Sequence, residues 1–144
     1  MPSFAQDPRR HKLVDVLVPL LRRTVPEEAG GYGGAYELRL TAQEADELGG
    51  VDLIRSAMRK AARSLGWSRL QTYGGVYGRA AVAGVVDQRE IPEPFATVVE
   101  AHRREREHAA VETVSRNMQD GKHRAVPGSV FVTAQEFRAA YAAQ

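Results

Sequence analysis

The stretch Val51–Trp67 has the pattern of an amphipathic helix whose polar face carries positive charge. Its apolar side chains recur with helical spacing and form one stripe, made of Ile54, Met58, Ala61 and Leu65. Beside this stripe an arginine stands at every fourth position, namely Arg55, Arg59 and Arg63. Like charges one helical turn apart destabilise an isolated helix by about 0.2–0.5 kcal/mol per pair. A bound polyanion would relieve this repulsion, and nucleic acid is the commonest polyanion.

Positive charge continues beyond this helix and is joined there by hydroxyl groups. No acidic residue occurs between Asp52 and Asp87. The candidate nucleic-acid-binding residues are Arg55, Arg59, Lys60, Arg63, Arg69, Thr72, Tyr73, Tyr77 and Arg79. Cationic side chains neutralise phosphates, and hydroxyl groups commonly contact the oxygens of the nucleic-acid backbone. The alternative is an exposed basic helix whose arginines pair with acidic residues of the preceding helix, namely Glu44, Asp46 and Glu47.

The sequence offers little support for catalysis, so we expect no enzymatic activity, no metal and no cofactor. The absence of cysteine excludes thiolate catalysis and cysteine-ligated metal sites. Glu105 and His108 have the spacing of half a di-metal carboxylate site, but such a site needs a second pair, and we interpret these two as part of a solvated charge run. The segments Gly30–Gly34 and Gly74–Gly78 lack the lysine and the hydroxyl of a phosphate-binding loop.

The elements that must position the basic helix begin with a helix and a strand. Asp7-Pro8 has the form of an N-cap followed by proline at the first helical position. The helix that follows carries its apolar residues at Leu13, Leu17, Leu20 and Leu21. Residues 35–40 alternate between apolar and polar as in a strand. Thr41-Ala42-Gln43-Glu44 is a capping box that opens a short helix, and Gly49-Gly50 ends it.

After the basic helix the sequence predicts a β-hairpin. Strands are expected near residues 68–73 and 76–86, joined at Gly74-Gly75 by the type I′ turn that two glycines favour. The fold class is then α+β, with a small antiparallel sheet (strands near 35–40, 68–73 and 76–86), helices and a long C-terminal helix. This order of elements is that of a winged helix-turn-helix, in which the second helix of the pair reads the major groove of DNA and the hairpin forms a wing.

A long helix is expected at Phe95–Met118, with its apolar residues at the two ends. Its middle part, His102–His108, contains no apolar residue, which is typical of a helix that leaves its domain or bridges two bodies. Two copies packed antiparallel would place apolar end against apolar end, so we expect a homodimer through Phe95–Met118. The alternative is a helix that folds back on its own domain.

The last part of the chain predicts a loop at Gln119–Gly128 and a short strand at Ser129–Val132. A second capping box, Thr133-Ala134-Gln135-Glu136, is expected to open a final helix that runs to Gln144. The chain is therefore divided into a core domain at 1–90, a long charged helix at 91–119 and a C-terminal loop and helix at 120–144, all in one folded unit.

The length and composition fit one small soluble domain. The chain has 144 residues and a formal net charge of only +2, so an anion-binding face requires segregated charge. Leu13–Leu21 is far shorter than the roughly 20 apolar residues that span a bilayer, so we expect a cytoplasmic protein without membrane contact. The expected function is nucleic-acid binding, with duplex DNA as partner, in an accessory or transcription-regulating role. The alternatives are an assembly protein that docks through its long charged helix and an RNA-binding protein.

Overall fold

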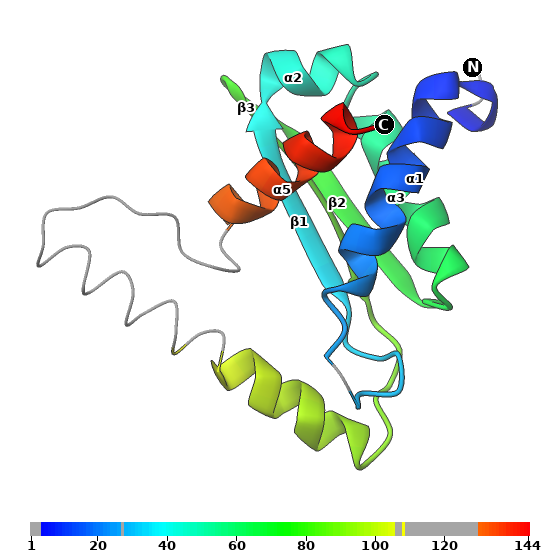
Figure 1. Ribbon diagram of the computed structural model, residues 1–144, viewed down its shortest axis with the longest axis vertical. Coiled ribbons are helices and arrows are strands. Elements are labelled where there is room, and N and C mark those ends of the chain that lie inside the picture. Colours follow the sequence, from blue (N-terminus) through cyan, green and yellow to red (C-terminus); the bar gives the residue numbers. More distant parts are fainter. Residues whose placement is uncertain (1–3, 27, 106–107, 109–129) are drawn as a thin grey trace, which may run out of the picture.

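A three-stranded antiparallel sheet carries its main helices on one face in the computed structural model, which describes residues 4–26, 28–105, 108 and 130–144. The elements in chain order are a 3₁₀ turn at Phe4–Gln6, α1 (Pro8–Arg22), β1 (Ala35–Thr41), α2 (Ala42–Glu47), α3 (Val51–Ser64), β2 (Leu70–Tyr77), β3 (Ala80–Asp87) and α5 (Val130–Ala142). The strand order is β1-β3-β2 (Figure 1). The predicted α+β class with a small antiparallel sheet is confirmed.

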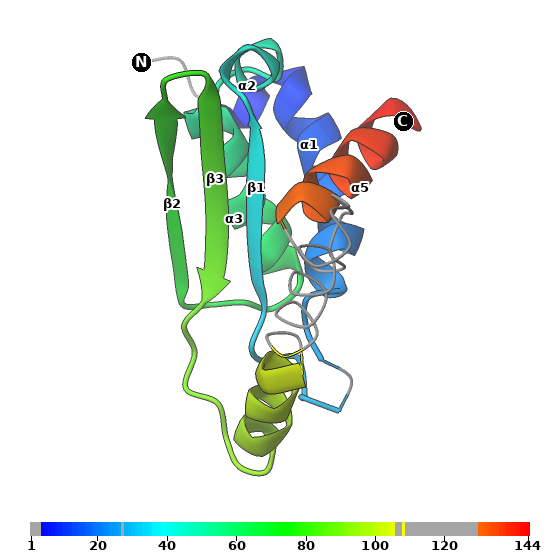
Figure 2. The ribbon, with the colours of Figure 1, turned by 90° about the vertical axis from the view of Figure 1, so that its left-hand side faces the viewer.

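The layers of the molecule follow from the apolar faces of its elements. In Figure 2 the sheet faces the viewer, α3 lies behind it, and no helix covers β2 and β3 from the front. Tyr36, Leu38 and Leu40 of β1 point toward the helices, as do Ala83 and Val85 of β3. Because side chains alternate along a strand, the intervening residues form a second face that the described helices leave open.

Helix α1 begins as the sequence predicts. The Asp7 carboxylate accepts a hydrogen bond from the backbone N–H of Arg9 at 2.9 Å, and Pro8 is the first helical residue. The helix buries the four predicted leucines and Val16. The second predicted start is also confirmed, because Thr41 and Glu44 form the reciprocal hydrogen bonds of a capping box at 3.1 and 3.0 Å.

Helix α3 buries more of its surface than the predicted stripe. Its buried side chains are Leu53, Ile54, Ala57, Met58, Ala61 and Ala62. The stripe is wide because α3 packs against α1 on one side and against β2 and β3 on the other. Leu65, which we expected in the stripe, lies just past the helix and is half-buried.

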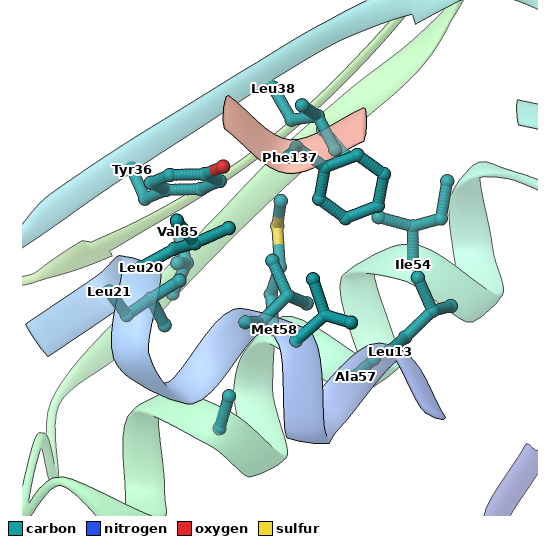
Figure 3. Close-up of a cluster of buried hydrophobic side chains, with 14 of the residues drawn as sticks. Leu13, Leu20, Leu21, Tyr36, Leu38, Ile54, Ala57, Met58, Val85 and Phe137 are labelled. Carbon is teal, nitrogen blue, oxygen red and sulfur yellow. The ribbon is translucent and has the colours of Figure 1, made fainter. Parts of the chain in front are cut away.

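One hydrophobic core joins these layers. Figure 3 shows side chains of α1, α3, β1, β3 and α5 meeting in a single cluster, with Met58 near its centre. Trp67, in the connection from α3 to β2, is 1% exposed and belongs to the same core. Phe137 brings α5 into the cluster and is equally buried. Truncating such a side chain to alanine typically costs about 3–5 kcal/mol of folding free energy.

The predicted hairpin turn at Gly74-Gly75 is wrong, and so are the strand bounds that depended on it. Both glycines lie within β2, where Gly74 pairs with Ala83 and Gly75 with Val82. The turn is Gly78-Arg79, since Tyr77 pairs with Ala80. Gly78 has φ +64° at the first turn position and Arg79 has no positive φ at the second, which together is the φ pattern of a type II′ turn. β2 and β3 therefore start and end later than predicted.

Two predictions near the C-terminus are also wrong. Residues 130–132 are helical rather than extended, because α5 begins at Val130. Thr133 therefore lies inside α5 and does not cap it. The reason is tertiary, since Ala134 and Phe137, one helical turn apart, are 3% and 1% exposed and pack α5 beside β1.

The expected helix at Phe95–Met118 is described only in part. Residues 95–105 are helical, and the segment packs on the connector after α1, where Phe95 stacks on Tyr32 with ring centroids 5.9 Å apart. The predicted apolar end at Val111, Val114 and Met118 and the loop at Gln119–Gly128 lie outside the described residues. Within the described part of the chain, no helix is long and apolar enough to cross a membrane.

A bidentate ion pair between α2 and α5 makes the stability of the fold depend on pH. Arg138 Nε and Nη2 donate to the Glu44 carboxylate at 2.7 and 2.8 Å, and these hydrogen bonds lower the pKa of Glu44 from 4.5 to about 2. A depressed carboxylate pKa contributes stability that is present above pH 4.5 and is lost as the pH falls toward 2. The pair is partly exposed, with 32% of the Glu44 side chain and 43% of the Arg138 side chain accessible, so its contribution is modest.

We predict that Arg138→Met lowers the free energy of unfolding by about 0.5–1 kcal/mol at pH 7. Methionine keeps an apolar stem at this position and removes only the charge. The difference from the wild type should shrink as the pH is lowered through the range from 4.5 to 2, as measured by urea unfolding at each pH. A difference that is the same at pH 2 and pH 7 would show that α5 is held by packing and not by this ion pair.

Candidate nucleic-acid interface

Helix α3 leaves only its outer face accessible, since its inner face is packed against α1 and the sheet. The outer face carries Asp52, Arg55, Ser56, Arg59, Lys60 and Arg63, none of which is buried. Lys60 and Arg63 are exposed, and Arg55 and Arg59 are half-buried where the helix borders β2. The structure therefore has a basic face on α3, but Arg55 and Arg59 are only partly accessible on it.

Two arginines of this face converge on one hydroxyl group of β2. Arg59 Nη1 donates to Thr72 Oγ1 at 3.0 Å, and Arg55 Nη2 donates to the same oxygen at 3.2 Å. Arg55 Nη2 also lies 3.3 Å from the Thr72 carbonyl oxygen. A hydroxyl oxygen has two acceptor lone pairs, and Thr72 uses both of them on guanidinium groups. This arrangement ties α3 to the edge strand and fixes both arginines.

The contacts of Arg55 are mainly structural. Its side chain is 29% exposed, and its only described ion pair is with Asp52 at a distance of 3.8 Å. Its buried Nε has no hydrogen-bond partner among the described residues, which adds a desolvation cost. By bonding the Thr72 carbonyl, Arg55 also occupies part of the free edge of β2, where a second strand would otherwise pair.

Arg59, Lys60 and Arg63 form the part of the surface that we call the basic stripe. Among the described residues, none of the three forms an ion pair. The alternative that these arginines pair with the preceding helix finds no support, because Glu44 pairs with Arg138 of α5 and Glu47 accepts from Gln43. The positive charge of the basic stripe is therefore left for solvent or for a ligand.

A neighbouring arginine that sequence reasoning missed lies on α1. Arg10 Nε donates to Ser56 Oγ at 2.9 Å, which places its guanidinium beside the outer face of α3. The positive surface thus extends from α3 onto α1. Arg10 lies one helical turn before Val14, which is partly buried against the core, but the sequence carries no signal for the contact between Arg10 and α3.

The other predicted site residues do not join the basic stripe. Arg69 precedes β2 and Arg79 lies in the hairpin turn, so the two stand beyond opposite ends of the strand. Tyr73 and Tyr77 project from the opposite face of the sheet, because they alternate with Thr72, which faces α3. Five of the nine predicted residues thus lie on the α3 side, two on the opposite face of the sheet and two beyond the ends of β2. The period-2 pattern of β2 is the signal that separates the two faces.

The tyrosine side of the sheet has its own hydrogen-bond network. Tyr73 Oη donates to Glu37 Oε1 at 2.9 Å across β3, and Arg39 Nε donates to Glu37 Oε2 at 3.1 Å. Burial together with the hydrogen bond to Glu37 raises the pKa of Tyr73 to about 12. Sequence reasoning missed Glu37 and Arg39, which alternate outward along β1. The phenol of Tyr73 is therefore protonated and held in place at neutral pH.

The described residues contain no group of three or more side chains that could hold a metal ion. Cations and hydroxyl groups on the α3 side and phenols on the other side are groups that bind phosphate and aromatic rings.

We predict that Thr72→Val lowers the free energy of unfolding by about 1 kcal/mol, because two guanidinium groups lose their shared acceptor. Valine keeps the β-branched shape and removes only the hydroxyl group. Thr97→Val is the matched control, since among the described residues the Thr97 hydroxyl bonds the exposed Glu93 side chain alone, at 2.9 Å. Urea unfolding that gives the same stability for both variants would show that Thr72 does not anchor the arginines.

No protein-family model matches this chain, and comparisons with curated proteins and with solved structures give no match. A function can therefore be inferred only from the residues of this chain. Two groups of residues suggest one, namely the basic stripe and the tyrosine side of the sheet.

Proposed function

We propose that the protein binds nucleic acid through the basic stripe of α3 and acts without catalysis. The single observation that carries this proposal is a row of cations on the outer face of α3, of which Arg59, Lys60 and Arg63 form no ion pair among the described residues. Arg55 and Arg59 share the hydroxyl of Thr72 as their acceptor, and Lys60 and Arg63 extend the charge along the helix. Holding like charges close together costs free energy, and contacts with a row of phosphates offset this cost.

The contacts are made chiefly to the phosphate backbone. The inner face of α3 is buried, so only side chains of its outer face reach a ligand, and these are cationic or short and polar. Such groups neutralise phosphates with little dependence on base sequence. Duplex DNA, with its dense rows of phosphates, is the partner we propose.

A winged-helix mode of binding is part of this proposal. The order α1, β1, α2, α3, β2, β3 supports it, with α3 as the helix that faces the duplex. In this arrangement the hairpin turn Gly78-Arg79 is the tip of the wing, and the exposed Arg79 reaches an adjacent phosphate. Because unrelated functions share the same order of elements, the charge on α3 is the stronger support for nucleic-acid binding.

The salt dependence of binding tests the proposal. Each phosphate contact contributes about −0.9 to the slope of log K against log salt on duplex DNA. We predict that the triple variant Arg59→Ala, Lys60→Ala, Arg63→Ala flattens this slope by about two to three units in fluorescence-anisotropy titrations.

The matched control removes three exposed cations from other surfaces, in the variant Arg22→Ala, Arg23→Ala, Arg103→Ala. Its net charge equals that of the stripe variant, so a general effect of charge would flatten both slopes equally. Equal slopes for the two variants would contradict the basic stripe as the binding surface. Titration with an RNA duplex of the same sequence identifies the partner, since stronger binding to RNA would replace DNA as the proposed ligand.

A further inference from the structure

A second surface, on the face of the sheet opposite α3, carries two exposed aromatic side chains. Tyr73 and Tyr77 of β2 are 37% and 67% exposed. They point away from the helices, on the face that Figure 2 presents to the viewer. We call these two residues the tyrosine platform.

The ring of Tyr73 lies over Gly84 of β3. Tyr73 is paired with Gly84, and a Cβ atom added at Gly84 would overlap Cζ, Oη and Cε1 of the tyrosine. The ring can take this position only because residue 84 has no side chain. Its hydroxyl group then reaches Glu37 on β1, at 2.9 Å, and this bond fixes the ring across the sheet. The ring therefore lies over the sheet, and 37% of the residue stays accessible to solvent.

The ring of Tyr77 is placed in the same way over β2. A Cβ added at Gly75 would lie 3.2 Å from Tyr77 Oη and 3.3 Å from its Cζ, so the ring folds back along its own strand above this glycine. Gly75 and Gly84 are diagonal neighbours of adjacent strands, and such positions lie about 7–8 Å apart. Two flat aromatic surfaces therefore stand next to each other on one face of the sheet.

The charges around the tyrosine platform suit a phosphodiester chain. Glu37 is compensated by Arg39, whose Nε lies 3.1 Å from it and whose side chain is 59% exposed. Arg79 lies exposed in the turn that follows Tyr77. The surroundings of the two rings are thus neutral to positive, with no other carboxylate on β2 or β3 before Asp87.

We propose that the open face of the sheet binds single-stranded nucleic acid by stacking bases on Tyr73 and Tyr77. Aromatic side chains on an open sheet stack two or three bases of a single strand, and such stacking is tolerant of sequence because every base has a π-face. Arg39 and Arg79 pair with the phosphates that flank the stacked bases. This surface lies across the sheet from the basic stripe, and the two proposed binding modes share only Arg79 of the hairpin turn.

The probe is a fluorescein-labelled oligothymidylate of about 12 nucleotides, with an oligouridylate of the same length to compare DNA with RNA. Tyr77→Ala is expected to weaken binding about tenfold or more in anisotropy titrations, because one stacked base loses its platform. Tyr77→Phe keeps the ring and should bind within about twofold of the wild type, since stacking needs only the aromatic face.

Val76→Ala is the matched control, since Val76 is the adjacent residue, is 58% exposed and points to the other face of the sheet. Its affinity for the oligonucleotide should stay at the wild-type value. Gly84→Ala retains both tyrosines but displaces the ring of Tyr73, and we expect it to weaken binding as much as Tyr73→Ala does. Circular dichroism of each variant confirms that it is folded.

Two outcomes would overturn the proposal. One is a Tyr77→Ala variant that binds both oligonucleotides as tightly as the Val76→Ala control. The other is the absence of any binding to either oligonucleotide at about 50 mM salt, where phosphate contacts are strongest. Duplex binding, measured in the same preparations, is expected to be unaffected by Tyr77→Ala, so failure of this proposal and failure of the basic stripe give different results.

Discussion

The packing of α3 between α1 and the sheet is the constraint on which the other features of the molecule depend. Six side chains of one helix are buried against two neighbours, and Met58 lies near the centre of the shared core. Because so much of α3 is covered, the remaining face is narrow and every polar residue of the helix is confined to it. The far side of the sheet carries no helix among the described elements. Both candidate surfaces are therefore consequences of where α3 lies.

Charge is organised differently on the two sides of the sheet. On the α3 side, Arg59 is held by a neutral hydroxyl group and forms no ion pair among the described residues, so its charge is not cancelled. On the tyrosine side, Glu37 is bonded by both Arg39 and Tyr73, and the network serves to hold a ring in place. Elsewhere, ion pairs join elements, as Arg138 does with Glu44, and Arg89 binds the buried Asp87 at 2.7 Å. Arg138 and Arg89 thus maintain the fold through ion pairs, whereas the cations of the basic stripe are available to a ligand.

The sequence predicted those features that depend on local pattern. The N-cap at Asp7, the capping box at Thr41 and the basic face of α3 all follow from residue types at helical spacing. The hairpin turn was misplaced because glycine pairs are ambiguous, and here Gly74 and Gly75 serve close approach within β2 rather than a turn. The start of α5 was missed because burial of Phe137 overrides a β-prone segment. The division of the site between two faces required the correct strand register, which local pattern alone did not supply.

The central claim is that the outer face of α3 contacts phosphates, and lysine footprinting tests it most directly. Lys60 is the lysine of the basic stripe, whereas Lys12 lies on α1 with its Nζ 3.8 Å from the ring centroid of Tyr141. Acetylation by a small reagent, with and without saturating duplex DNA, is read at each lysine by mass spectrometry. Our account predicts that DNA protects Lys60 and leaves the labelling of Lys12 unchanged. Equal labelling of Lys60 in the free and the DNA-saturated protein would contradict it.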